Sequence, residues 1–342
     1  MSTGSRALRA AVIGAGAMGR NHCRVYHELP GVDLVGVADA DPATAERAGH
    51  SFHVPHFPSP AAVLAATRPD LVTVAVPTMG HLPVALEAIA GGAHVLVEKP
   101  LAFTVEEGRQ IIAAAAAAGR ILAVGHVERY NPALTELQGR LGAGALGRVF
   151  QMHAQRLGPF PARVRDVGVV VDLATHDVDI MRYLSGAEVT RISAETARRI
   201  HTDHEDLLSG LLRFSDGTIG VLDINWLTPT KIRQLTVTGE GGMFHVNYLT
   251  QDLYFYENDY ASSPWDTLSN IAGVNEGNMM RLRLDRAEPL RRELEAFVAA
   301  VRGESRNIVS GEDGLKAVEI TQQIVTAGLT GETVHLVESA AR

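Results

Sequence analysis

The sequence predicts an α/β protein in which a doubly wound parallel sheet is followed by a second α/β part with a large, mostly antiparallel open sheet. Over residues 1–128, short apolar runs alternate with helical segments, which is the pattern of βαβ units. Over residues 129–342, most strand-like stretches alternate polar and apolar positions, which is typical of antiparallel sheets. We therefore predict two domains, 1–128 and 129–342.

The composition is that of an ordinary globular protein, with 46% hydrophobic and 20% charged residues among 342. The net charge of −8 argues against a nucleic-acid partner. A single cysteine, Cys23, leaves no intramolecular disulfide and no Cys-rich metal site, and we expect no bound metal. We find no apolar run long enough to cross a membrane and no signal-peptide core in residues 1–9, so we expect a cytoplasmic protein without a membrane partner.

The first element is a buried strand, Leu8–Ile13, which leads directly into a glycine-rich loop and a helical segment, Arg20–Leu29. The loop fits G-x-G-x-x-G, in which the glycines permit a tight turn, close approach of pyrophosphate, and helix–strand packing. Free N–H groups at the helix start then face the anion. This pattern predicts a Rossmann-type dinucleotide site that includes Gly14, Gly16, Ala17, Met18 and Gly19.

The second strand, Leu34–Ala38, is followed by Asp39, which lies 20 residues after Gly19. A carboxylate at this position accepts a hydrogen bond from the ribose 2′-OH and repels a 2′-phosphate, so the sequence favours NAD over NADP. Arg20 and Arg47 leave NADP possible. The alternative interpretation is a structural glycine turn followed by a surface Asp.

Further βα units complete the parallel sheet. Thr104 and Glu107 fit a capping box at the start of an Ala-rich helix that runs to Gly119. His81 either lies near the cofactor or only begins its helix. The remaining predicted elements of this half are the strands Asp70–Val76, Ala93–Val97 and Ile121–Val127 and the helix His81–Ala90.

Lys99 is the most informative single residue, because it follows the strand Ala93–Val97 within Glu98-Lys99-Pro100. Open α/β sheets bind ligands at the carboxyl ends of their strands, so this Lys is predicted to present its ammonium group to a substrate.

The second half begins with a helix opened by Asn131-Pro132 and continues into predicted strands. Helices would cover one face of their sheet and leave the other for substrate or a partner subunit. The predicted strands are Val149–Arg156, Val189–Thr196, Leu207–Phe214, Gly217–Leu227 and Ile232–Gly239, and the late helices are Leu290–Arg302 and Gly314–Gly328.

A predicted helix near Asp172 contains the candidate catalytic residues of this half. Asp172, His176 and Asp179 are spaced i, i+4 and i+7, which places them on one helix face. A His exchanges protons near neutral pH, so we predict that Asp172 and His176 are catalytic and contact substrate. The alternatives are an N-cap Asp with a structural His, or a metal pair.

Three arginines, Arg156, Arg163 and Arg165, precede this helix around a Pro-rich loop. Their guanidinium groups are predicted either to clamp substrate phosphates or to form a solvated basic loop.

Together these motifs resemble the Gfo/Idh/MocA family of sugar and cyclitol oxidoreductases, over nearly the whole chain. The resemblance implies catalytic roles for Lys99, Asp172 and His176, and a homo-oligomer (dimer or tetramer). It implies cofactor contacts from the glycine loop, Asp39 and four further places. The motifs are residues 14–19, 95–101, 128–132, 172–179 and 311–314, and the further contacts are Pro77, Thr78, Glu98 with Lys99, and Asn131.

Residues 158–170 and 231–256 most resemble the UDP-N-acetylglucosamine 3-dehydrogenase branch of that family. We therefore expect NAD(P)-dependent oxidation of a secondary alcohol on a sugar ring, at C3 of a UDP-amino sugar. The order Pro77-Thr78 departs from the family's usual Thr-Pro. The alternatives are an inositol or free-sugar dehydrogenase and, in another class, a non-catalytic dinucleotide sensor.

Overall fold

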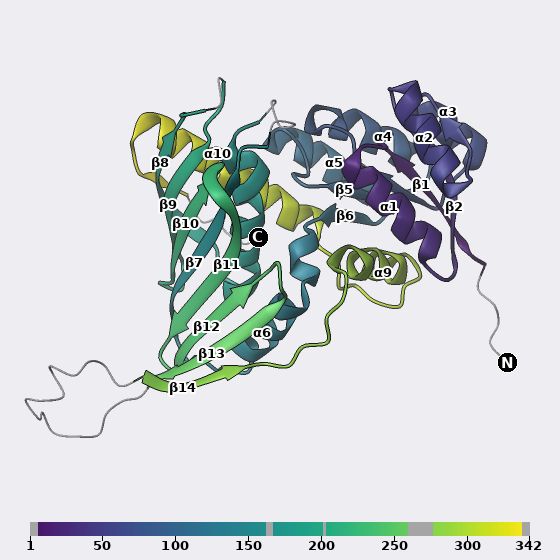
Figure 1. The fold of residues 1–342 in the computed structure, drawn as a ribbon. Helices are drawn as coiled ribbons and strands as arrows, with labels where there is room; N and C mark the ends of the chain where they lie inside the picture. The colour runs from purple at the N-terminus through teal and green to yellow at the C-terminus, as the bar shows by residue number, and fades with distance from the viewer. Residues whose placement is uncertain (1–5, 162–166, 201–202, 259–275, 337–342) are drawn as a thin grey trace, which may run out of the picture. The chain divides into compact units, whose positions relative to one another are not determined.

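The computed structural model describes residues 6–161, 167–200, 203–258 and 276–336 (Figure 1). The chain divides into two compact units. The first contains residues up to 130 together with 288–319, and the second contains 131–287 together with the residues from 320 onward. The predicted fold class is confirmed, because a parallel sheet occupies the first unit and a mostly antiparallel sheet the second.

The first unit is built on a six-stranded parallel sheet with the order β3-β2-β1-β4-β5-β6. This order reverses between β1 and β4, as in doubly wound folds. The strands are β1 (Leu8–Ile13), β2 (Val32–Ala38), β3 (His56–Phe57), β4 (Leu71–Val74), β5 (His94–Glu98) and β6 (Leu122–Gly125). The helices are α1 (Ala17–Glu28), α2 (Pro42–Phe52), α3 (Pro60–Thr67), α4 (His81–Ala90) and α5 (Val105–Ala117), with short 3₁₀ turns η1 (Thr78–Gly80) and η2 (Val127–Tyr130).

Core layers lie on both faces of this sheet, as the side chains of β5 show. Val95 and Val97 pack into one layer with α4 and α5, whereas Leu96 packs into the other with α1. Because successive strand residues point to opposite faces, Glu98 belongs on the same face as Leu96. The predicted capping box of α5 is confirmed, with Thr104 Oγ1 accepting from the Glu107 amide.

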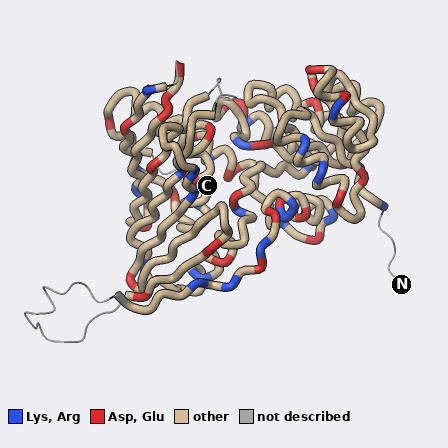
Figure 2. Tube along the Cα trace, viewed as in Figure 1, with Lys and Arg blue, Asp and Glu red and all other residues tan. Residues whose placement is uncertain are grey.

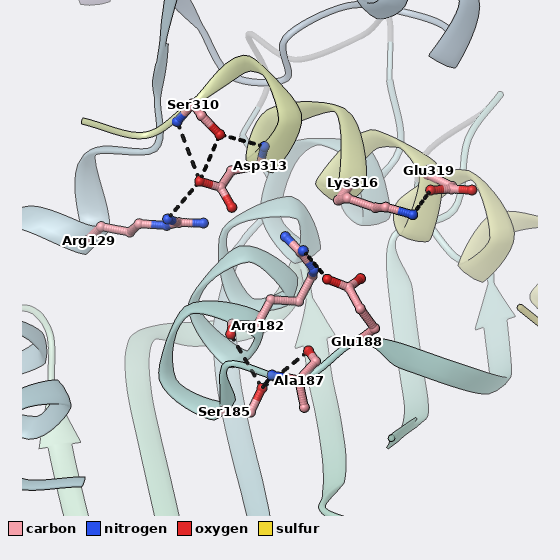
Figure 3. Close-up of polar contacts among 9 residues, drawn as sticks. All are labelled: Arg129, Arg182, Ser185, Ala187, Glu188, Ser310, Asp313, Lys316 and Glu319. Carbon is pink, nitrogen blue, oxygen red and sulfur yellow. Dashed lines mark hydrogen bonds and ion pairs between the residues drawn. The ribbon is translucent and has the colours of Figure 1, made fainter. Parts of the chain in front are cut away.

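A segment from the end of the chain returns to this first unit. It contains α9 (Pro289–Val301) and the beginning of α10 (Gly311–Thr330). Ser310 and Asp313 cap α10 reciprocally, and Asp313 also accepts a hydrogen bond from Arg129 at 3.3 Å (Figure 3). The sequence-based division at residue 128 places this segment in the second domain, whereas its contacts place it with the first.

The second unit is built on a nine-stranded sheet with the order β14-β13-β12-β11-β7-β10-β9-β8-β15. β7 and β10 run parallel, and the other described pairs are antiparallel. The strands are β7 (Val149–Pro159), β8 (Val189–Ala197), β9 (Leu207–Phe214), β10 (Ile219–Asn225), β11 (Leu227–Gly239), β12 (Gly242–Asn247), β13 (Asp252–Asn258), β14 (Glu276–Arg281) and β15 (Val334–His335).

Helices cover one face of this sheet. Leu134 of α6 (Pro132–Gly142), Val178 of α7 (Thr175–Ser185) and Ile324 of α10 pack with Leu222 and other strand residues in one continuous core. On the opposite face, Leu211 is 51% exposed. The helix predicted near Asp172 begins as a π-helical turn, η3 (Val170–Ala174), before α7.

Acidic and basic residues are interspersed along both units (Figure 2). Within the described ranges, no helix is long and apolar enough to cross a membrane. The same residues contain no group of three or more His, Cys, Asp or Glu side chains arranged to hold a metal ion.

Two helical glycines make a matched test of the packing at α10. A Cβ at Gly314 would lie 2.7 Å from Val124 Cγ2 and 3.2 Å from Leu101 Cβ, whereas a Cβ at Gly139 in α6 would meet nothing within 4 Å. Gly314→Ala should therefore lower stability by about 1–3 kcal/mol through overpacking. Gly139→Ala should be neutral or raise stability by up to about 1 kcal/mol. Thermal unfolding of both variants checks this, and equal Tm values would contradict the close packing at Gly314.

Candidate active site

The glycine loop between β1 and α1 has the backbone geometry that the sequence predicts. Gly14 has φ +95°, and a Cβ there would lie 2.4 Å from the Ala75 carbonyl oxygen. A Cβ at Gly19 would lie 1.7 Å from the carbonyl oxygen of Gly14. Gly16 has open space where its Cβ would be, and Ala17 begins α1 directly after it. The loop thus leaves its middle glycine and the helix start, with Met18, open to a phosphate group, which fits a dinucleotide.

Asp39 lies at the end of β2, beside this loop. Its Oδ2 accepts a hydrogen bond from the Ala15 amide at 2.7 Å, and its Oδ1 accepts one from the Asp41 amide at 2.9 Å. Each carboxylate oxygen has a second lone pair, so both can also accept from a ribose hydroxyl. The carboxylate is half-buried and held close to the glycine loop, which fits the predicted contact with the ribose.

His81 connects two turns at the carboxyl edge of the sheet. Its Nδ1 lies 2.9 Å from the Pro100 carbonyl oxygen, and its Nε2 lies 3.0 Å from that of Val76. Burial lowers the pKa of this imidazole, and a neutral ring donates to only one of the two carbonyls. The ring therefore joins the turn that contains Pro77 and Thr78 to the turn after Lys99. A direct contact of His81, Pro77 or Thr78 with the cofactor stays a prediction.

Glu98, the last residue of β5, turns its carboxylate inward. Its Oε1 lies 2.8 Å from His22 Nε2 of α1, and its Oε2 accepts a hydrogen bond from the Lys99 amide at 3.2 Å. Burial by itself would raise the pKa of Glu98, but the hydrogen bond from His22 and the nearby Lys99 ammonium hold it below its usual value. Glu98 is therefore an ionised group that fixes the backbone at Lys99. The predicted contact between Glu98 and the cofactor is not tested by this geometry.

The predicted base and its partner lie on the second unit. Asp172 lies in the π-helical turn η3, and His176 lies in the first turn of α7; both side chains are half-buried. Single π turns often occur at functional sites. Asp179, which the helical spacing places on the same face, is 1% exposed and belongs to the core side of α7. The side chains of Asp172 and His176 are thus more exposed than that of Asp179.

Arg156 lies on β7, within the second unit. Its Nε lies 2.6 Å from Asp177 Oδ2 and its Nη2 lies 3.0 Å from Asp177 Oδ1, while its guanidinium stacks 5.3 Å from the Tyr248 ring centre. Arg156 is 3% exposed and Asp177 is 1% exposed. This buried bidentate pair ties β7 to α7 next to His176, so the structure gives Arg156 a supporting role for the helix in place of the predicted contact with substrate phosphates. Arg163 and Arg165 lie outside the described residues.

Asn131 has both ends of its amide engaged within the second unit. Its Oδ1 accepts from the Ala133 amide at the start of α6, and its Nδ2 donates to the Tyr248 carbonyl. The side chain is 2% exposed. These contacts give Asn131 a structural role, and its predicted cofactor contact stays a prediction.

Sequence reasoning missed His22, Asp177 and Glu293. His22 is three residues after Gly19, in the helical segment predicted to follow the glycine loop, and Asp177 directly follows His176 inside the motif 172–179. Glu293 interrupts an otherwise apolar helix face with Leu290, Leu294 and Phe297. A carboxyl group at such a position is a signal that the sequence does contain.

Comparison with known families and proteins decides the class. Residues 8–126 match the oxidoreductase family with an NAD-binding Rossmann fold, and residues 134–245 match the GFO/IDH/MocA C-terminal domain. The chain belongs to the Gfo/Idh/MocA oxidoreductase family. Its first unit is therefore an NAD-binding Rossmann domain, which confirms the predicted cofactor.

The individual relatives described below share between about a quarter and slightly more than a third of their residues with this chain. The UDP-N-acetylglucosamine 3-dehydrogenase of Acidithiobacillus ferrooxidans is 28% identical over 94% of this chain and 97% of that protein. Its solved structure gives a TM-score of 0.83, with 27% identity over 94% of this chain and 98% of the other. Inositol 2-dehydrogenase 4 of Saccharopolyspora erythraea is 36% identical, but over 57% of this chain and 59% of that protein.

The position of Asp39 makes cofactor choice testable. Asp39→Ser removes the carboxylate that would repel a 2′-phosphate, so the ratio of kcat/KM for NAD to that for NADP should fall by roughly 10- to 100-fold, the value of one charged contact. The matched control is Asp41→Ser, which removes a neighbouring exposed carboxylate that caps α2. Wild-type kinetics that favour NADP, or an equal change in both variants, would contradict this role of Asp39.

Proposed function

We propose that this oxidoreductase uses NAD to oxidise a secondary alcohol on a sugar ring, at C3 of a UDP-amino sugar such as UDP-N-acetylglucosamine. The observation that carries this proposal is the match to a UDP-N-acetylglucosamine 3-dehydrogenase over nearly the full length of both chains, in sequence and in fold. We further expect a homo-oligomer and a cytoplasmic location, both on the basis of the sequence.

The proposed roles follow from the chemistry of each residue. The glycine loop and Asp39 hold NAD, which supplies the hydride acceptor when bound. His176 takes the proton of the substrate hydroxyl, because a neutral imidazole is a base near pH 7. Lys99 stabilises the negative charge that develops on the same oxygen, as a preorganised ammonium group does. Asp172, which precedes His176 by about one helical turn, orients the imidazole or balances its charge.

The main rival is an inositol or free-sugar dehydrogenase. It is supported by the 36% identity to an inositol 2-dehydrogenase over slightly more than half of the chain. The proposed chemistry at Lys99 and His176 would be the same, because inositols also present ring hydroxyl groups. A dinucleotide sensor without turnover is less consistent with the chain, which retains Lys99, Asp172 and His176 together.

A substrate screen tests the proposal directly. Purified protein is mixed with NAD and UDP-N-acetylglucosamine, free N-acetylglucosamine or myo-inositol, and formation of NADH is followed by absorbance. We expect turnover of the UDP-sugar and little of the other two. Efficient oxidation of free sugar or inositol would overturn the nucleotide-sugar assignment, and no turnover with any alcohol would favour the sensor.

The same assay tests Arg163, one of the two arginines that remain in the proposed clamp. Arg163→Gln should raise KM for the UDP-sugar by roughly tenfold, because a charge-assisted hydrogen bond is lost. The control is Arg148→Gln, which changes an exposed Arg just before β7, at the opposite end of that strand from the Pro-rich loop. An equal KM in the two variants would remove Arg163 from the clamp.

A further inference from the structure

Glu293 is a carboxyl group on the apolar face of a core helix. On α9, Leu290, Glu293, Leu294 and Phe297 follow the i, i+3, i+4 and i+7 spacing of one face. Leu290, Leu294 and Phe297 pack into the core of the first unit, and Glu293 between them is only 2% exposed. A buried carboxyl group is costly unless it is neutral or hydrogen-bonded, so this position requires an explanation.

The layer that receives α9 also contains the pair formed by Glu98 and His22. Leu96 of β5 packs in the same cluster as α9, and Glu98 is two residues further along the strand on the same face. His22 lies on α1, which packs against α9 (Figure 1). Glu293 and Glu98 are therefore two carboxyl groups within one buried layer, and Glu98 is bound directly to the amide of Lys99.

The two carboxyl groups have unequal partners. Glu98 accepts hydrogen bonds from His22 and from the Lys99 amide, whereas the oxygens of Glu293 have no hydrogen-bond partner in the part of the chain that the structure describes. Burial, and then the negative charge of Glu98, hold the pKa of Glu293 well above its usual range. The ionised form therefore belongs to Glu98 and the proton to Glu293.

Four other ionisable groups on the neighbouring elements are either neutral or paired with a carboxylate. Burial raises the pKa of Cys23 to about 12, and burial also raises the pKa of Tyr26, whose hydroxyl lies 3.0 Å from Thr73 Oγ1. Both stay neutral at neutral pH. Arg24 pairs with Glu288 and Arg129 pairs with Asp313. The remaining groups on α1, on β5 and directly after it, and on β6–η2 are Arg20, His22, His27, Glu28, His94, Lys99, His126, Glu128 and Tyr130.

His22 supplies a matching acceptor. Because Glu98 is ionised and can only accept, His22 Nε2 carries the proton of their hydrogen bond. A neutral His22 ring would then have its lone pair on Nδ1, an atom that is buried without a hydrogen-bond partner among the described residues. One buried donor and one buried acceptor thus stand without partners in the same layer, where nearly all polar groups are normally satisfied.

We propose that the protonated carboxyl of Glu293 donates to His22 Nδ1 through one buried water, and so completes a chain from Glu293 through His22 and Glu98 to the amide of Lys99. Glu293 is then a positioning residue for Lys99, and this part rests on the proposed catalytic role of that Lys. The chain fixes the His22 ring, which orients the Glu98 carboxylate, which in turn holds the backbone from which Lys99 projects.

Infrared spectroscopy tests the proton on Glu293 without any turnover. At pH 7 in heavy water, the wild-type protein should show the carbonyl stretch of a protonated carboxylic acid, and Glu293→Gln should lose that band. The matched control is Glu295→Gln on the same helix, because Glu295 is exposed and pairs with Arg291. A band that persists in Glu293→Gln would overturn the proposal. A wild-type protein without the band would also overturn it, because that result favours a charged His22 between two carboxylates.

The pH dependence of unfolding gives a second readout with a definite sign. The unfolded chain ionises this Glu above a pH of about 4.3, whereas the folded protein keeps it protonated. Rising pH therefore favours the unfolded wild type, and this loss continues until the folded-state pKa of Glu293 is reached. Glu293→Gln should gain Tm relative to wild type as the pH rises from 5 to 8, and Glu295→Gln should not. A constant difference between Glu293→Gln and wild type would overturn the assignment.

Activity separates positioning from simple packing. With the substrate found by the screen, Glu293→Gln keeps a donor and should retain turnover, while Glu293→Leu should lose about tenfold in kcat, the rate equivalent of one hydrogen bond, with little change in KM for NAD. Equal kcat values in the Gln and Leu variants would overturn the positioning role. If no substrate is turned over, the proposed function fails, whereas the infrared and unfolding results still decide the proton on Glu293.

Discussion

Glu98 is buried at the carboxyl end of β5, and its two oxygens bind His22 of α1 and the amide of Lys99. An ionised carboxylate in this place is tolerated only because donors surround it. Those donors come from the helix that follows the glycine loop and from the backbone that leads to Lys99. The same interaction therefore links the dinucleotide loop to the strand end that presents the proposed catalytic ammonium group. His81 adds a second link, between the turns after β4 and β5.

The motif residues within the first unit were predictable because their constraints are local. The glycine loop is dictated by backbone conformation, since a side chain at Gly14 or Gly19 would collide with neighbouring backbone. Lys99 is identified by an apolar strand that ends in a turn, and Thr104 by its capping partner three residues later. Each of these patterns is complete within about 15 residues of sequence, so no knowledge of distant contacts is required.

The contacts that support the site were not predictable in the same way. The return of α9 to the first unit depends on the packing of Leu290, Leu294 and Phe297. The start of α10 is held there by close packing at Gly311 and Gly314, which lie far along the chain from their neighbours in α5 and β6. Arg156 was grouped with Arg163 and Arg165 by charge and proximity. Its position on β7 instead directs it into the core, where Asp177 neutralises it. Sequence proximity describes which charges are near one another along the chain, whereas strand direction decides which of them reach solvent.

In the proposed reaction, the turn after β5 presents Lys99 to the reacting oxygen of an alcohol. The most direct measurement compares NAD binding with the rate of hydride transfer in Lys99→Met, under single-turnover conditions with the substrate that the wild type oxidises. If the ammonium group acts on the substrate, NAD should bind with nearly the wild-type Kd while the rate falls roughly 100- to 1000-fold. A near-normal rate, or a loss of NAD binding that accounts for the whole decrease, would contradict the claim.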